Sequence, residues 1–236
     1  MIGSPHGAVT VIKIGGGLTW VPQALERVCR AVGQVSREWP IVVVPGGGPF
    51  ADGVREFDRR LGLSPDVAHW MAILAMDQYA HVLASRIPGA VLVEEPGCIR
   101  EALRPAGAVV LAPSRWMRSA DVLPHTWDVT SDSIAAFVAG ALDARRLILI
   151  KPDSAAAEPV DQYFSTTLPA GMPYSIIGCD RIEELSQELT RLRAGVEWHH
   201  RWPGASWQDV PRSDPPERGD RPDNPGFRHT PASAAG

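Results

Sequence analysis

Lysine is almost absent from this 236-residue sequence. Of its 23 basic side chains only two, Lys13 and Lys151, are lysines, and arginine supplies the rest. Arginine serves surface ion pairs as well as lysine does. The skew therefore marks the two lysines as positions where a compact ammonium is needed in place of a planar guanidinium. Chance placement of two residues is the alternative explanation.

Cysteine, net positive charge and long apolar runs are also scarce. The three cysteines, Cys29, Cys98 and Cys179, have no zinc-type spacing, which predicts reduced thiols in a cytoplasmic protein. The formal net charge of −4 argues against a nucleic-acid partner, which requires a basic face. No apolar run approaches the roughly 18 residues of a membrane span, and the N-terminus lacks the pattern of a secretory signal. We therefore expect neither a nucleic-acid nor a membrane partner.

The stretch Val9–Trp20, VTVIKIGGGLTW, is the first motif present. Its β-branched part predicts a buried strand, and Gly15, Gly16 and Gly17 end that strand with a tight turn. The backbone N–H groups of such a turn can hold a phosphate, with Lys13 beside them as a point charge. A glycine run also serves as a plain turn, so the motif alone leaves both readings open.

Strands and helices alternate along the chain. Residues 40–45 form a second buried strand, which also ends in glycines, Gly46, Gly47 and Gly48. The other expected elements are strands over 10–14, 90–93, 108–111, 146–150 and 174–177, helices over 22–35, 50–61, 65–87, 99–104, 131–142 and 182–192, and a loop over 112–129. Such alternation predicts βαβ units, and hence an α/β fold with a parallel sheet.

The polar motifs fall where the expected strands end. Both glycine runs, the helix start at Ser131-Asp132 and Lys151 follow carboxyl ends of strands. Parallel sheets bind their ligands outside these ends. The topology thus brings distant residues to one edge of the sheet, which favours phosphate binding over a plain turn.

The C-terminal part differs in composition. We expect one domain over 1–194 and a Pro-, Gly- and Trp-rich tail over 195–236 that is disordered, or wraps the protein surface or a neighbouring subunit. His199 and His200 are adjacent but have no partner cluster, so solvated side chains are favoured over a metal site.

The ordered motifs VIKIGGG, VVPGGGP, VTSDSIAA and LILIKPD resemble the amino acid kinase superfamily over residues 9–192. Neither a P-loop nor a GxGxxG motif is present. The resemblance implies the amino acid kinase fold, a three-layer αβα sandwich with a mainly parallel central sheet. The segments AHWMAILAMDQYAHVLA, LPHTWDVTSDSIAAFVA and LIKPD followed by VDQYF look most like the kinases of methanofuran biosynthesis. That branch implies ATP-dependent phosphorylation of (5-aminomethyl)furan-3-yl methyl phosphate to the diphosphate.

The resemblance also implies residue roles. Lys13 neutralises the transferring phosphoryl group, Asp132 orients lysine or the Mg²⁺ shell, and Lys151 and Asp153 lie by the ATP phosphates. Gly15, Gly16 and Gly17 donate to the ATP phosphates, and the acceptor side comprises Gly46, Gly47, Gly48, Thr130 and Ser131. The implied cofactors are ATP and Mg²⁺, the metal being carried by ATP without direct protein ligands. A small-molecule phosphate acceptor and a homo-oligomer are implied as well.

Three further residues are assigned to the acceptor. Trp127 is suited to stacking on a furan ring and Asp128 to holding an ammonium group, although a purely structural loop is the alternative. Asp77 is semi-buried by pattern and needs a partner, which is either the acceptor amine or an arginine such as Arg55.

A lysine that some kinases of this superfamily carry is missing from this sequence, and its absence narrows the class of acceptor. Amino-acid-phosphorylating relatives carry a further lysine after a Gly-Met pair, whereas Gly171-Met172 is followed here by Pro173 and Tyr174. This argues for a phosphate acceptor over a carboxylate. A uridylate or isopentenyl phosphate kinase, and a non-catalytic nucleotide- or oxyanion-storage protein on the same fold, stay open as alternatives.

Overall fold

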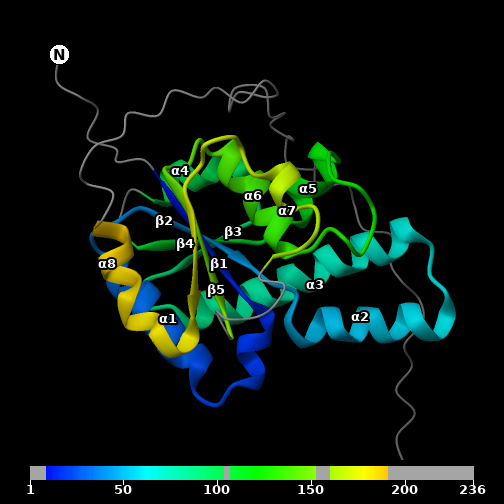
Figure 1. Ribbon diagram of the computed structural model, residues 1–236, viewed down its shortest axis with the longest axis horizontal. Helices are drawn as coiled ribbons and strands as arrows, with labels where there is room; N and C mark the ends of the chain where they lie inside the picture. Colours follow the sequence, from blue (N-terminus) through cyan, green and yellow to red (C-terminus); the bar gives the residue numbers. More distant parts are fainter. Residues whose placement is uncertain (1–8, 104–106, 153–159, 191–236) are drawn as a thin grey trace, which may run out of the picture.

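The protein is built around a six-stranded parallel sheet with the strand order β3-β4-β2-β1-β5-β6 (Figure 1). The structure, a computed structural model, describes residues 9–103, 107–152 and 160–190. The predictions for Asp153 and for the tail over 195–236 lie outside these residues. Every strand pair is parallel, as the alternation of strands and helices predicts.

The elements follow the expected order with a few additions. The strands are β1 (Thr10–Ile14), β2 (Ile41–Pro45), β3 (Val91–Val93), β4 (Ala108–Leu111), β5 (Arg146–Lys151) and β6 (Tyr174–Gly178). The α-helices are α1 (Ala24–Val35), α2 (Gly48–Leu61), α3 (Pro65–Arg86), α4 (Ile99–Ala102), α5 (Ser114–Ala120), α6 (Ser131–Ala141), α7 (Phe164–Thr167) and α8 (Leu185–Thr190). Three 3₁₀ segments are η1 (Gly16–Trp20), η2 (Pro96–Cys98) and η3 (Cys179–Glu184).

Helices cover both faces of the sheet, so the αβα sandwich is confirmed (Figure 1). Successive residues of β1 point to opposite faces, which places Val11 in one core with α6 and Ile12 in another with α1. Both residues are fully buried. The strands are therefore apolar on both sides, which is the reason they read as continuous runs of valine and isoleucine. Within the described ranges no helix is long and apolar enough to cross a membrane.

Helices α5 and α7 were not expected. The segment over 112–129 is predicted as a loop, yet Ser114–Ala120 is helical, with Trp116 and Met117 buried in the core. A seven-residue helix is too short to be stable by itself, so tertiary packing decides its formation. The four-residue helix α7 depends in the same way on the buried Phe164.

Local signals did fix the start of the long helix α3. Ser64 Oγ accepts a hydrogen bond from the backbone N–H of Val67 at 3.4 Å, and Pro65 occupies the first helical position. This is the predicted cap. Helices α2 and α3 pack against one another and extend beyond the sheet, where Figure 1 shows them as an antiparallel pair.

Candidate active site

Two lysines converge on one carboxylate at the carboxyl edge of the sheet. Neighbouring strands β1 and β5 carry Lys13 and Lys151, and Asp132 lies in the first turn of α6. Lys13 Nζ is 2.8 Å from Asp132 Oδ1, and Lys151 Nζ donates a hydrogen bond of 2.6 Å to Asp132 Oδ2. The only two lysines of the chain thus share one ion-pair partner, as the topology predicts.

This lysine–aspartate cluster is buried and carries a net positive charge. Side-chain exposure is 7% for Lys13, 4% for Asp132 and 16% for Lys151. Burial raises the pKa of Asp132, but the two ammonium groups outweigh this effect and hold that pKa below its usual value. Burial and the charge of Lys13 lower the pKa of Lys151. Two ammonium groups against one carboxylate leave one positive charge for an anionic ligand.

The two glycine loops touch beside this cluster. A Cβ atom on Gly16 would lie 2.2 Å from the backbone nitrogen of Gly48, and one on Gly46 would lie 2.6 Å from the backbone nitrogen of Gly16. Gly48 also has a φ of +57°, which L side chains rarely adopt. Glycine is therefore needed in both loops because the two backbones approach within contact distance.

Not every glycine can donate to a phosphate. The N–H of Gly15 donates to the carbonyl of Ile150 at 2.9 Å, and that of Gly46 donates to the carbonyl of Ile14 at 2.8 Å. These two N–H groups are already hydrogen-bonded to neighbouring strands, so they cannot donate to a phosphate. This corrects the expectation that Gly15 binds ATP. Neither Gly15 nor Gly46 lines the cleft described below.

The available donors lie one or two residues later in each loop. Gly16 and Gly17 open η1, and Gly48 opens α2. The first N–H groups of a helix lack intrahelical acceptors and carry a partial positive charge. Together with the N-terminus of α6 at Ser131, three helix starts face the same cleft.

The contact between the glycine loops makes Gly16 sensitive to substitution. We expect Gly16→Ala to destabilise the protein by about 1–3 kcal/mol, because the methyl group forces the backbone at Gly48 away. Activity should fall as well, since both loops shift. Thermal unfolding and kcat/KM test this. Gly53→Ala in α2 is the matched control because its Cβ meets nothing within 4 Å, and an equal effect of both substitutions would contradict the prediction.

A carboxylate missed by sequence reasoning organises the start of α6. Asp161 Oδ2 accepts hydrogen bonds from Thr130 N (3.0 Å), Thr130 Oγ1 (2.7 Å) and Ser133 N (3.0 Å), and Asp161 Oδ1 accepts one from Ser133 Oγ. The hydroxyl group of Thr130 therefore donates its hydrogen bond to Asp161, and the same hydroxyl oxygen accepts a hydrogen bond from Asp132 N. This corrects the assignment of Thr130 to the acceptor phosphate: it caps α6 and positions Asp132.

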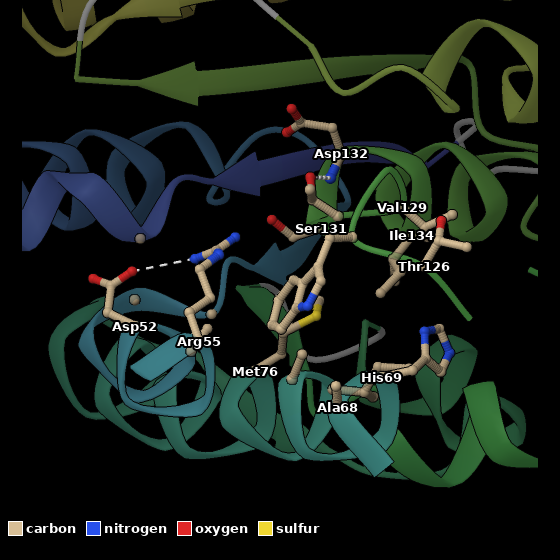
Figure 2. Close-up of a pocket in the computed structure, with 18 of the residues that line it drawn as sticks. Asp52, Arg55, Ala68, His69, Met76, Thr126, Val129, Ser131, Asp132 and Ile134 are labelled. Carbon is tan, nitrogen blue, oxygen red and sulfur yellow. Dashed lines mark hydrogen bonds and ion pairs between the residues drawn. The ribbon is translucent and has the colours of Figure 1, made fainter. Parts of the chain in front are cut away.

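A cleft of about 700 Å³ opens from the lysine–aspartate cluster toward α2 and α3. Figure 2 shows its wall, with Asp132 and Ser131 facing residues of the helix pair. The apolar part of the wall includes Ala51, Leu63, Pro65, Ala68, Ala72, Ile73, Met76, Val129 and Ile134. The expected site residues that line the cleft are Lys13, Gly16, Gly17, Gly47, Gly48, Trp127, Thr130, Ser131, Asp132 and Lys151.

Two carboxylates assigned to the acceptor lie elsewhere. Asp77 Oδ1 accepts a hydrogen bond of 3.0 Å from Ser114 N and so caps the unexpected helix α5. Arg55, the arginine expected as its partner, pairs with Asp52 instead, and Asp77 is not part of the cleft wall. Asp128 is exposed and outside the cleft wall, and its backbone carbonyl accepts from Tyr163 N. Both assignments are therefore corrected.

Trp127 does line the cleft, as expected of an acceptor-binding residue. Its Nε1 donates a hydrogen bond of 2.7 Å to Asp58 Oδ2 on α2, and the guanidinium carbon of Arg55 lies 5.0 Å from the centroid of its ring. The side chain is 38% exposed. The tryptophan is thus neither buried nor free, but is held by α2.

An imidazole pair forms another part of the wall. The rings of His69 and His125 stack with centroids 4.1 Å apart. His125 Nδ1 lies 2.7 Å from Asp66 Oδ1, and Nε2 lies 2.9 Å from Asp121 Oδ1. The bond to Asp66 raises the pKa of His125, whereas burial lowers the pKa of His69 to about 4. At neutral pH His69 therefore presents an uncharged ring to the cleft.

The donors at the lysine end suit phosphate groups more than a bare metal ion. Among the described residues, no group of three or more His, Cys, Asp or Glu side chains is arranged to hold a metal. Ammonium groups and helix N-termini supply hydrogen-bond donors and positive charge, which fit phosphate oxygens.

Sequence comparisons agree with this geometry. The family model described as "Amino acid kinase family" matches residues 8–154. The [5-(aminomethyl)furan-3-yl]methyl phosphate kinase of Methanocaldococcus jannaschii is 30% identical over 176 residues, which are 75% of this chain and 77% of that enzyme.

Solved structures show the same fold. The UMP kinase of Bacillus anthracis superposes with a TM-score of 0.58 at 13% identity, over 77% of this chain and 92% of that chain. The aspartate kinase of Synechocystis gives a TM-score of 0.51 at 16% identity, over 73% of this chain and 38% of the longer aspartate kinase.

Proposed function

The chain belongs to the amino acid kinase family and is an ATP-dependent phosphotransferase, and we propose that its acceptor is the phosphate group of [5-(aminomethyl)furan-3-yl]methyl phosphate, which it converts to the diphosphate. The relative from M. jannaschii supports this acceptor through its sequence similarity. The reaction would serve the biosynthesis of a methanofuran-type carrier. The homo-oligomer implied by the resemblance stays a prediction.

The pairing of both lysines with Asp132, beside the two touching glycine loops, carries the proposal. Transfer between two phosphates brings several negative charges into one site. Catalysis then consists mainly of positioning and charge neutralisation. The net positive cluster and the helix starts at Gly16, Gly48 and Ser131 provide both.

Phosphoryl transfer from ATP to a phosphate defines the roles of Lys13, Lys151 and Asp132. ATP with Mg²⁺ supplies the phosphoryl group and part of the charge neutralisation. An oxygen of the acceptor phosphate forms the new bond to phosphorus while the bond to the ADP oxygen breaks. This oxygen is already ionised near neutral pH, so no general base is required. Lys13 and Lys151 bind the phosphoryl oxygens, and Asp132 fixes both ammonium groups.

The polarity of the cleft wall argues against one of the alternative acceptors, isopentenyl phosphate. Isopentenyl phosphate would need an apolar lining around its hydrocarbon chain. The cleft instead exposes Asp52, Asp58 and His125 beside its apolar residues. A storage protein needs no preorganised transfer site, so the lysine–aspartate cluster and the kinase relative both favour catalysis.

A competition among acceptors tests the proposal. The purified protein is incubated with ATP, Mg²⁺ and, in turn, the aminomethylfuran phosphate, UMP and isopentenyl phosphate. ADP release gives kcat/KM, and ³¹P NMR identifies the diphosphate. We expect kcat/KM for the aminomethylfuran phosphate to exceed the others by about 10²-fold or more, since buried polar groups discriminate strongly. A higher value for UMP or isopentenyl phosphate would overturn the proposal.

A further inference from the structure

Three carboxylates line the cleft, and two of them have cationic partners. Asp132 pairs with Lys13 and Lys151. Asp52 pairs with Arg55 at 3.2 Å, the interaction dashed in Figure 2. The third is Asp58, and among the residues that the structure describes no lysine, arginine or histidine forms an ion pair with it.

Asp58 is nevertheless held firmly. Its Oδ1 accepts a hydrogen bond of 3.1 Å from Leu63 N, and its Oδ2 accepts one of 2.7 Å from Trp127 Nε1. Both donors are neutral, so they fix the orientation of the carboxylate without cancelling its charge. The carboxylate is therefore preorganised at the cleft wall with lone pairs left over.

The position of Asp58 on its helix adds to the negative potential. It lies in the last turn of α2, where the backbone carbonyls carry a partial negative charge. An acid is unfavourable there unless a cation is nearby. Arg59 and Arg60 of the same turn contact Glu56 instead. Arg55 pairs with Asp52 and lies over the ring of Trp127. The cleft thus has a positive end at Lys13 and Lys151 and, on α2, a carboxylate that forms no ion pair with the described residues.

We propose that Asp58 is the residue that binds the ammonium group of the acceptor. This inference rests on the proposed function, because the aminomethylfuran phosphate carries one phosphate and one ammonium. It takes the place of Asp128, which the sequence suggested for this role. The indole of Trp127 holds the carboxylate toward the cleft and lines the path between the two charged ends.

The distance along α2 between Gly48 and Asp58 is large enough for the acceptor and the transferring phosphoryl group. Asp58 lies ten positions after Gly48 on α2, which is about 15 Å along the helix axis at 1.5 Å per residue. An extended acceptor spans about 8 Å from phosphorus to nitrogen when covalent bonds of roughly 1.5 Å are summed. The remaining length accommodates the transferring phosphoryl group beside the lysines. The opposite charges of the substrate and of the cleft then match end to end.

A pair of acceptors that differ only in the ammonium group tests the inference. The natural acceptor is compared with (5-methylfuran-3-yl)methyl phosphate in the wild type and in Asp58→Asn. We expect Asp58→Asn to lower kcat/KM for the amine about 10- to 100-fold, mainly through KM, because a charge-assisted hydrogen bond is lost. For the methyl analogue, kcat/KM should change less than about threefold. Calorimetric titration of each acceptor without ATP should show the same selective loss.

Controls separate this inference from the proposed function. Glu56→Gln removes one negative charge from the outer side of the same helix and should affect neither acceptor. Asp58→Ala, which removes the charge together with the hydrogen bond to Trp127, replaces Asp58→Asn if the latter unfolds. A folded Asp58 variant that still prefers the amine as strongly as the wild type overturns the role of Asp58 alone. A wild type that does not phosphorylate the amine overturns the proposed function and this inference with it.

Discussion

Replacing Lys13 with alanine is expected to lower kcat/KM by about 10²–10³-fold or more while the fold is retained. The ammonium group of Lys13 lies beside the first glycine loop, and the other lysine, Lys151, is on β5 and already bonded to Asp132. The fold survives because Asp132 keeps its hydrogen bond to Lys151, so the buried carboxylate retains a cation. Steady-state kinetics and thermal unfolding measure the two effects separately.

Two further variants sharpen the Lys13 experiment. Lys13→Arg keeps the charge, but a guanidinium is larger and planar and should not restore activity in a site where a compact ammonium lies 2.8 Å from Asp132. Arg30→Ala removes an exposed cation from α1 and should leave kcat/KM unchanged. Near-normal turnover of Lys13→Ala would refute the assignment of the transfer site to this cluster.

Asp132→Asn is expected to reduce both activity and stability. The substitution leaves the ammonium groups of Lys13 and Lys151 facing one another without an anion. Removing one partner of a buried ion pair costs about 3–5 kcal/mol, and the partial exposure of Lys151 places the loss near the lower value. The lysines also lose their fixed positions, so kcat/KM should fall by about 10²-fold or more.

The pH dependence of the unfolding free energy identifies the cause. Burial and Lys13 already lower the pKa of Lys151, and without Asp132 that pKa falls further. The unfolded variant then binds more protons than the folded one, so its stability rises with pH until Lys151 is neutral in both states. We therefore expect the deficit relative to wild type to shrink between pH 7 and pH 10 in urea titrations. Asp180→Asn, at an exposed position, is the control. A deficit independent of pH would contradict the electrostatic explanation.

Much of the fold is encoded locally, and these parts were predicted correctly. The apolar run of β1 and the cap of α3 at Ser64 act through neighbouring residues, so their patterns are readable in the sequence. Helix α5 is different, because its formation depends on Asp77, 37 residues earlier in the chain. A sequence pattern gives the semi-buried character of Asp77, but it does not give the backbone group that the carboxylate meets.

The candidate site divides in the same way. The lysines and the glycine loops were found because parallel strands must end at one edge, which is a consequence of connectivity alone. The sequence by itself therefore determined the family, the α/β class and the phosphate end of the cleft. The tertiary structure decided which N–H groups already have partners in the sheet, as for Gly15, and that Asp58, not Asp128, is among the acids of the cleft wall. These choices depend on contacts between residues far apart in the chain, whose distances and orientations arise only when the helices pack.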